Sequence, residues 1–389
     1  MRKKLKDVCM FYSGTGFPIQ YQGQTKGEYP FYKVGDIANN AIAGKIYLEL
    51  CNNYISSDVA KMIKGCILPK DTVVFAKIGE ALKLNRRAIT SCDCLIDNNA
   101  MGIAPKLDSL RIQYFYFCMK NLKMQTLAES TTVPSVRKTV LEKYEIEVPS
   151  LVEQEEIEKK LTLTQKIIEK RRQELSYLDE IIKARFVEMF GDPVKNPKGW
   201  EVVTIGDIVT EVRYGTSKPA VEGGKYPYLR MNNLTADGHL DLNDLKYIDI
   251  PDDEIEKCVV RKGDVLFNRT NSIELVGKTV VFDLQEDMII AGYIIRVRLN
   301  KRLLPEILSQ YMNLEALKDI LRSMAKGAVN QANINAQELR SIKVYIPDME
   351  LQKQFIEMKN QVDKSKVAVQ KALDETQILF DSLMQKYFG

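Results

Sequence analysis

The chain repeats itself, and this repeat limits its fold more than any other feature of the sequence. Residues 144–149 align with residues 342–347. Both segments have the pattern of a short strand that ends in proline. The same offset of about 198 residues places Gln154 on Gln352. A long internal period of this kind indicates a duplicated structural unit.

The similarity continues toward the start of each half with small gaps. The upstream matches pair residues 5–8 with 205–208, residues 29–34 with 226–231, and residues 71–77 with 263–269. Short strand-like matches arise by chance, but an ordered series at nearly constant spacing does not. We therefore expect two similar domains in one chain.

Each half has the same order of parts. Segments such as Asp71–Ile78, Val265–Asn268 and Tyr293–Leu299 are rich in valine, isoleucine, phenylalanine and tyrosine, as strands are. Residues 111–124 and 307–324 have the apolar spacing of amphipathic helices. Because strands and helices are mixed in each half, we predict an α+β fold of two similar domains.

A long helix is predicted to close each half. Residues 153–190 contain no glycine and no proline. Apolar residues recur there every seven positions, at Leu161, Ile168, Leu175, Ile182 and Met189. The second helix has an equivalent stripe at Phe355, Val362, Val369 and Leu383. A seven-residue period keeps one face against a partner helix in a coiled coil.

We expect the two helices to pack on each other as an antiparallel coiled coil with pseudo-twofold symmetry, one domain at each end. Pairing between two copies of the chain is the alternative. The predicted boundaries are 1–150 and 192–348 for the domains, and 151–191 and 349–389 for the helices. Apolar residues off the stripe are expected to bind partner proteins: Ile157, Ile167, Ile181 and Phe186.

The composition is that of an ordinary globular protein of 389 residues, with 45% hydrophobic and 28% charged residues. The 7 cysteines are irregularly spaced, which favours reduced thiols and a cytoplasmic protein. No apolar run is long enough to span a bilayer, so we expect no membrane span. Residues 1–150 hold 21 basic and 14 acidic side chains, whereas the second domain is slightly acidic. A net charge of about +7 on the first domain suits an anionic partner, although a solvated lysine-rich surface has the same composition.

Motifs for catalysis are missing from the sequence. There is no GxxxxGK[ST] phosphate loop, and Asp192-Pro193-Val194 lacks the second proline and the aromatic ring of an adenine methyltransferase loop. The single histidine, His239, has no counterpart in the first half, which disfavours general-base or metal chemistry. Residues 13–16 and 215–218 are interpreted as turns at matching positions. We therefore expect no catalytic, cofactor or metal site in this chain.

Basic and amide side chains suited to DNA remain. Arginine and lysine can donate to guanine, and asparagine and glutamine can pair with adenine in the major groove. The first domain offers Lys77, Lys83, Arg86, Arg87 and Arg137. The second domain offers Lys218, Arg230, Asn232, Asn268, Arg269, Asn271, Lys326, Asn330 and Gln331. Solvated turn charge is the competing interpretation. The aromatic run 114–117 is predicted to be core rather than a stacking platform.

The duplicated layout, the junction FGDP…NPKGW at residues 190–200, and the passages 130–157 and 327–352 resemble the specificity (S) subunit of a type I restriction–modification enzyme. The resemblance covers essentially the whole chain. It implies that each domain is a target recognition domain, which reads one half of a split, asymmetric DNA sequence. The helical pair would then set the unspecified gap between the two half-sites.

The resemblance also implies partners. Two modification subunits, which carry the S-adenosylmethionine-dependent methyltransferase, would dock on the helices, and restriction subunits would add an ATP- and Mg-dependent nuclease. The chain itself would be a non-catalytic subunit. Two other hypotheses stay open: the DNA-recognition part of a single-chain restriction–methylation system, and a coiled-coil scaffold that does not bind DNA.

Overall fold

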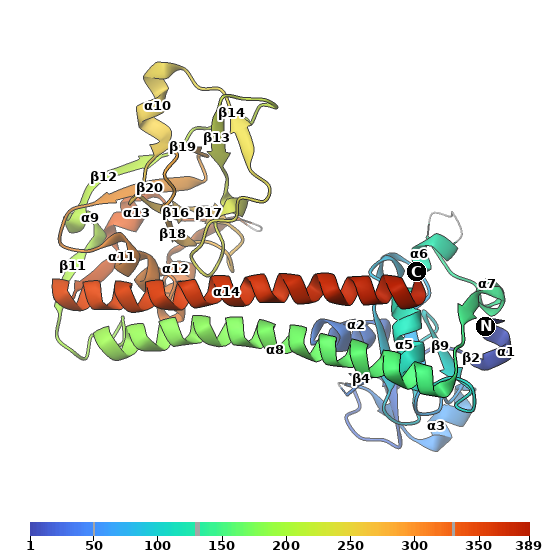
Figure 1. Cartoon of the computed structure of the whole chain (residues 1–389). Coiled ribbons are helices and arrows are strands. Elements are labelled where there is room, and N and C mark those ends of the chain that lie inside the picture. Colours follow the sequence, from blue (N-terminus) through green and yellow to red (C-terminus); the bar gives the residue numbers. More distant parts are fainter. Residues whose placement is uncertain (50, 129–132, 329–330) are drawn as a thin grey trace. The chain divides into compact units, whose positions relative to one another are not determined.

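The computed structural model of the chain describes residues 1–49, 51–128, 133–328 and 331–389. Packing divides the chain into two units: unit 1 comprises residues 1–172 and 371–389, and unit 2 comprises residues 173–370. Each unit therefore combines one globular domain with a segment of each long helix (Figure 1). No helix in the described ranges has the length and apolarity that a membrane span requires.

Unit 1 contains a mixed α/β domain. Its strands are β1 (Arg2–Lys4), β2 (Cys9–Ser13), β3 (Tyr29–Tyr32), β4 (Tyr47–Leu48), β5 (Tyr54–Ile55), β6 (Val73–Ala76), β7 (Arg87–Thr90), β8 (Leu95–Ile96), β9 (Ala100–Pro105) and β10 (Glu145–Glu147). Its short helices are α1 (Leu5–Val8), η1 (Ile19–Tyr21), α2 (Val34–Ile42), α3 (Ser57–Met62), α4 (Glu80–Lys83), α5 (Ile112–Asn121), α6 (Met124–Leu127) and α7 (Lys138–Lys143). The aromatic run 114–117 of α5 is buried, as predicted.

Unit 2 contains the second mixed domain. Its strands are β11 (Glu201–Thr204), β12 (Val209–Tyr214), β13 (Tyr226–Leu229), β14 (Lys246–Ile248), β15 (Val259–Val260), β16 (Val265–Asn268), β17 (Thr270–Asn271), β18 (Thr279–Val281), β19 (Met288–Ile290), β20 (Ile294–Leu299), β21 (Lys326–Ala328), β22 (Gln331–Asn333) and β23 (Lys343–Ile346). Its short helices are α9 (Ile205–Ile208), η2 (Met231–Asn233), α10 (Asp252–Cys258), α11 (Pro305–Met312), α12 (Glu315–Met324) and α13 (Ala336–Ser341).

The strand order shows the duplication directly. The sheet β2-β9-β6-β7-β4 of unit 1 corresponds to β12-β20-β16-β18 of unit 2, and β5-β3-β8 corresponds to β14-β13-β19. In both units the pair β3–β8 or β13–β19 is parallel, while the adjoining pair β3–β5 or β13–β14 is antiparallel. The first and last strands of each domain also pair, as β1–β10 and β11–β23. Two similar mixed domains are thus confirmed.

The two long helices are α8 (Leu151–Phe190) and α14 (Met349–Phe388). They begin at the predicted residues and end one residue earlier. Within unit 2 they pack antiparallel: the Phe186 ring of α8 lies 5.2 Å from the Phe355 ring of α14, and Asp179 is ion-paired with Lys366 at 2.5 Å. A later residue of one helix therefore meets an earlier residue of the other, as in the predicted coiled coil.

The burial of Phe186 corrects one sequence prediction. Its ring is fully buried, and it packs edge-on against Phe190 and Phe355 at centroid distances of 4.8 and 5.2 Å. These three rings belong to the main hydrophobic core of unit 2. Phe186 is therefore not available to a partner protein, because the chain's own domain already covers this face of α8.

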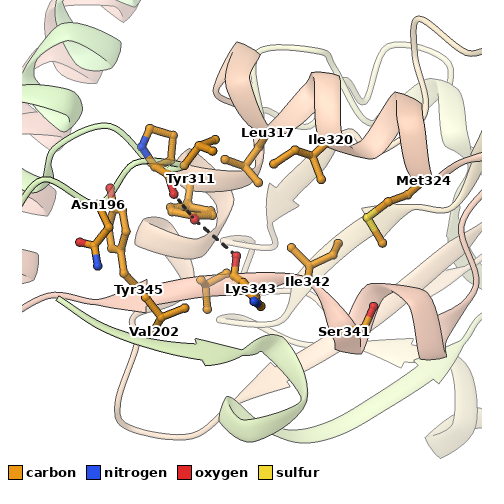
Figure 2. A pocket seen from close by; sticks show the side chains of 13 residues that line it. Asn196, Val202, Tyr311, Leu317, Ile320, Met324, Ser341, Ile342, Lys343 and Tyr345 are labelled. Atoms are coloured by element: carbon orange, nitrogen blue, oxygen red, sulfur yellow. Dashed lines mark hydrogen bonds between the residues drawn. The ribbon is translucent and has the colours of Figure 1, made fainter. Parts of the chain in front are cut away.

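The segment that follows α8 is held against unit 2 by hydrogen bonds to its backbone. The Trp200 indole donates to the Phe190 carbonyl at 2.8 Å, and the Tyr345 hydroxyl donates to the Gly191 carbonyl at 3.2 Å. The Tyr311 hydroxyl donates to the Pro193 carbonyl at 2.8 Å (Figure 2). A largely apolar cavity of about 350 Å³ lies beside this junction. The junction motif noted in the sequence thus ends the helix and returns the chain to the domain.

A buried glutamine fixes the start of each long helix. In unit 1 the side-chain oxygen of Gln154 accepts from the Arg111 backbone N–H at 2.9 Å. Its amide donates to the carbonyls of Ser109 and Pro149, also at 2.9 Å. In unit 2, Gln352 makes the same set of bonds: it accepts from the backbone of residue 304 and donates to the carbonyls of residues 302 and 347.

We expect Gln352→Ala to lower the free energy of unfolding of the full chain by about 3 kcal/mol, because it leaves a backbone donor and two carbonyls without partners at a fully buried position. Urea unfolding followed by circular dichroism measures this loss. Gln173→Ala is the control, since Gln173 is exposed on α8, and its effect should stay within about 0.5 kcal/mol. Equal effects of the two substitutions would contradict the anchoring role.

Candidate nucleic-acid interface

Unit 2 gathers four of the predicted DNA-binding residues around one surface hollow of about 550 Å³. Lys218, Arg230, Asn232 and Arg269 all line it, although the sequence places them in three separate segments. The exposed ring of Tyr293 lines the same hollow. Cationic, amide and aromatic groups on one concave surface are the side chains that contact phosphates and base edges.

Arg269 is held in place by its backbone and by an aromatic ring. It lies between β16 and β17, where its N–H donates to the Tyr293 carbonyl at 3.0 Å and its carbonyl accepts from Ile334 at 2.9 Å. Its guanidinium lies 4.9 Å from the centre of the Tyr214 ring. A stacked guanidinium is restricted in direction, so its donors are positioned before a ligand binds.

The other cations of the hollow are paired with carboxylates. Arg230 contacts Asp244 at 2.8 Å, and Lys218 contacts Glu254 at 2.9 Å. Asp244 is exposed and Glu254 partly so, so these pairs are open to water. Exposed ion pairs of this kind contribute little to stability and can be exchanged for phosphate contacts.

A close backbone approach at Gly215 precedes the segment that carries Lys218. A Cβ atom on Gly215 would lie 2.1 Å from the Ile290 carbonyl oxygen, so no other residue fits there. In unit 1, a Cβ atom on Gly14 would meet the Asp97 carbonyl oxygen at 1.7 Å. The two motifs thus lie at matching positions, but their interpretation as turns was wrong: each continues a strand in extended form, and Thr15 and Thr216 make parallel bridges to Asp97 and Ala291.

The predicted amide cluster is partly structural. Asn268 is fully buried, and its amide donates to the carbonyls of Thr270 and Tyr293 at 3.2 Å. Its oxygen accepts from Asn271 at 2.9 Å. Because all of its polar atoms are used within the fold, Asn268 does not present an edge to DNA, which corrects that prediction. Asn271 remains half-buried at the surface.

The second predicted cluster of this domain lies beside Arg269. Strand β17 pairs with β22, and β22 pairs with β21, so Ala332 and Asn333 of β22 lie next to Asn271 and Thr270. Lys326 and Gln331 lie in these strands, and Asn330 falls outside the described residues.

Unit 1 builds the equivalent connection. The Lys77 carbonyl accepts from the Val136 N–H at 2.9 Å, as the Arg269 carbonyl accepts from Ile334 in unit 2. Lys77 therefore occupies the place of Arg269. Arg137 directly follows Val136, and its side chain is exposed. Of the first predicted cluster, Lys77 thus lies beside the segment that carries Arg137.

Sequence reasoning missed Lys33, which corresponds to Arg230. Lys33 and Arg230 each precede a short helical segment. In both, the backbone N–H donates at 2.8 Å to the side chain three residues later, which is Asp36 for Lys33 and Asn233 for Arg230. The Lys33 ammonium lies 5.6 Å from the centre of the Phe17 ring. The repeat alignment already paired residues 29–34 with 226–231, so the signal was present in the sequence.

The remaining basic residues of the first domain diverge. Lys83 is exposed and paired with Glu80 at 2.7 Å. Arg87 is buried, and its guanidinium donates to the carbonyls of Asn85 and Leu122. This burial corrects the prediction that Arg87 reads a DNA groove, because its donors are used to fix a turn. Arg86 is half-buried in a separate cavity of unit 1.

Of the apolar residues predicted to bind partners, three remain at the surface of α8. Ile167 and Ile181 are exposed by 38% and 45%, and Ile157 is half-buried. These fractions leave the three side chains available to another protein.

A family model matches both halves of the chain. The model described as "Type I restriction modification DNA specificity domain" matches residues 1–177 and 197–376. Similar curated proteins include the putative type I restriction enzyme MjaX specificity subunit of Methanocaldococcus jannaschii, 30% identical over 196 residues, which are 49% of this chain and 46% of that protein. Another is the type I restriction enzyme EcoKI specificity subunit of Escherichia coli K12, 25% identical over 68% of this chain and 61% of that protein.

Solved structures share the fold. The S subunit of a type I restriction–modification system from M. genitalium matches with a TM-score of 0.54 at 14% identity, over 100% of this chain and 96% of that one. A chain from a structure on complex assembly and conformational transition of the type I R-M system matches with a TM-score of 0.60 at 18% identity, over 100% and 97%. Both likenesses concern the fold alone.

The family model covers both repeats and most of the chain, so the chain belongs to the family of type I restriction–modification DNA specificity domains. The matched regions span about half to three-fifths of the length of the curated relatives above.

Proposed function

We propose that this chain is the DNA-reading specificity subunit of a type I restriction–modification complex. Each domain reads one half of a split, asymmetric sequence in double-stranded DNA. The observation that supports this most is the hollow of unit 2, where Lys218, Arg230, Asn232 and Arg269 converge from separate segments. The equivalent connection at Lys77 in unit 1 extends the proposal to both domains.

The equivalent positions of the two domains carry different side chains, which suits an asymmetric site. Arg269 offers a planar fork of donors that matches guanine O6 and N7, whereas Lys77 offers a single flexible ammonium. Arg230 and Lys33 differ in the same way. Two domains with one backbone plan and different side chains are expected to read different half-sites.

The catalytic chemistry is assigned to partners. We infer that two modification subunits dock on the exposed apolar side chains of the long helices, among them Ile157, Ile167 and Ile181. S-adenosylmethionine would be bound by these subunits, and ATP and Mg would be used by restriction subunits. This chain would then contribute binding and position but no reacting group.

Methylation assays with purified components test this division of labour. The chain alone should transfer no methyl group from S-adenosylmethionine to DNA, while the chain with its modification subunit should methylate adenine. Either component alone would be the control for the other. Methylation by this chain without a partner would contradict the proposal and would favour a single-chain enzyme.

We further propose that helix length sets the gap between the half-sites. Insertion of one heptad at matched points of α8 and α14 preserves the apolar stripe and adds about 10 Å of helix. The gap should lengthen by about three base pairs, since base pairs stack about 3.4 Å apart, and both half-sites should stay the same. Methylation mapping of the variant complex measures this. A heptad inserted into α8 alone is the control and should abolish activity, whereas an unchanged gap in the double insertion would exclude the ruler.

A further inference from the structure

Unit 1 contains a basic cavity whose lining does not include Lys77. Its volume is about 380 Å³, and it is lined by segments of the domain and of both long helices, all within unit 1. Five cationic side chains line it: Lys45, Arg86, Arg87, Lys120 and Arg172. Two carboxylates, Glu169 and Asp381, also line it.

The carboxylates offset only part of this charge: Glu169 and Asp381 both act on Lys120, and Lys45 is ion-paired with Glu49 at 2.5 Å. Glu169 accepts from the amide of Gln165 at 3.1 Å, and Asp381 accepts from the amide of Gln377 at 3.0 Å. Among the residues that the structure describes, Arg86 and Arg172 take part in no ion pair. The cavity therefore holds a clear excess of positive charge.

Arg87 forms the buried end of this cavity. Only 3% of its surface is exposed, its donors reach carbonyl and amide oxygens rather than a carboxylate, and its Nε atom is buried without a hydrogen-bond partner. Burial lowers the pKa of Arg87 to about 10, so its guanidinium remains charged at neutral pH. A buried cation without a counter-charge is costly, and an anion in the cavity would offset that cost.

Lys120 adds a second confined charge. Its ammonium lies 5.3 Å from the centre of the Phe380 ring, and burial lowers its pKa. Such a charge is weakly hydrated, so an incoming anion displaces less water from it than from an exposed lysine. The partly exposed Arg86 and the exposed Arg172 leave the cavity open to a ligand.

We propose that this cavity binds a phosphate group. Guanidinium forks match tetrahedral oxyanions in two-point hydrogen bonds, and a volume of about 380 Å³ accommodates a phosphodiester with its flanking atoms. The source that we favour is the backbone of DNA held by the same domain, a choice that rests on the proposed function. Arg86 then serves affinity and not base choice. The alternative source of the same chemistry is free phosphate.

The test uses the assembled complex and a double variant at the mouth of the cavity, Arg86→Gln with Arg172→Gln. Arg87 and Lys120 are left intact because they support the fold. The control is Lys61→Gln with Lys70→Gln, which removes the same charge from two exposed lysines of unit 1. Affinity for a duplex of arbitrary sequence is measured over a range of salt concentrations.

If the cavity holds a backbone phosphate, the double variant should bind DNA about tenfold more weakly at low salt. The slope of log affinity against log salt should fall by about one to two, since each lost phosphate contact removes about 0.9. The control variant should bind as the wild type does. A separate thermal-unfolding measurement compares inorganic phosphate with sodium chloride at equal ionic strength.

The two measurements separate the sources. An unchanged salt slope, with phosphate stabilising the wild type but not the double variant, would support a free-phosphate site and reject the DNA backbone. No change in either measurement would overturn the proposal. Neither measurement requires a recognised sequence, so each tests the cavity alone. If the proposed reading function were wrong, the wild-type complex would instead show no preference among DNA sequences.

Discussion

Arg269→Ala should weaken binding of the complex to its recognised sequence by about 10- to 100-fold, because a two-point contact to a guanine contributes about 1–3 kcal/mol. Arg269 is the best candidate for such a contact, since its guanidinium is oriented by the Tyr214 ring and lines the hollow of unit 2. Fluorescence anisotropy with cognate and scrambled duplexes measures the loss.

The pattern of the loss distinguishes base contact from backbone contact. A base contact predicts a large loss on the cognate duplex, little loss on the scrambled one, and relaxed preference at one position of one half-site. Arg269→Lys keeps the charge but removes the fork, so it should resemble alanine more than wild type. Arg302→Ala is the control: Arg302 is another arginine of unit 2, and it pairs with Glu201 at 2.6 Å. If Arg269→Ala bound like Arg302→Ala, the hollow would not be the reading surface.

Phe186→Ala should lower the free energy of unfolding by about 3–5 kcal/mol, the usual cost of removing a fully buried aromatic side chain. The loss includes the edge-on contacts to Phe190 and Phe355 as well as the cavity left behind. Urea unfolding of the full chain measures it. Unit 2 should be affected first, because the ring belongs to its core.

Val187→Ala is the matched control for this substitution. Val187 is the next residue of α8 and is 42% exposed, so its loss should be within about 0.5 kcal/mol. A partner-binding role for Phe186 would predict the reverse: little change in stability and weaker binding of the modification subunit. That outcome would contradict the packing of the helix pair in unit 2.

The fold could be predicted because its evidence is repeated in the sequence. Each half carries the same strand signals, the same buried glutamine and the same long apolar period. A structure predicted for one half is therefore supported by the same pattern in the other half. Gln154 and Gln352 illustrate this: the alignment paired them, and the structure gives them the same three hydrogen bonds. The period of seven also located the buried faces at Leu161, Ile168 and Ile182.

The site was harder to predict because sequence does not tell which charged loop residue folds inward. Arg87 begins a strand and Asn268 ends one, so both look like groove residues, yet both are buried and bond to neighbouring backbone carbonyls. Phe186 lies off the seven-residue stripe, and it is buried by the domain core as well as by Phe355 of the partner helix. Lys33 was missed because the repeat was not used to transfer Arg230 to the first domain.

The most direct test of two-domain reading is a map of methylated adenines in DNA exposed to the complex of this chain with its modification subunit. The account predicts one motif made of two different specified halves with a fixed unspecified gap. Exchange of residues 192–348 for the second domain of a relative should change one half only. A continuous motif, or a change in both halves after that exchange, would contradict the account.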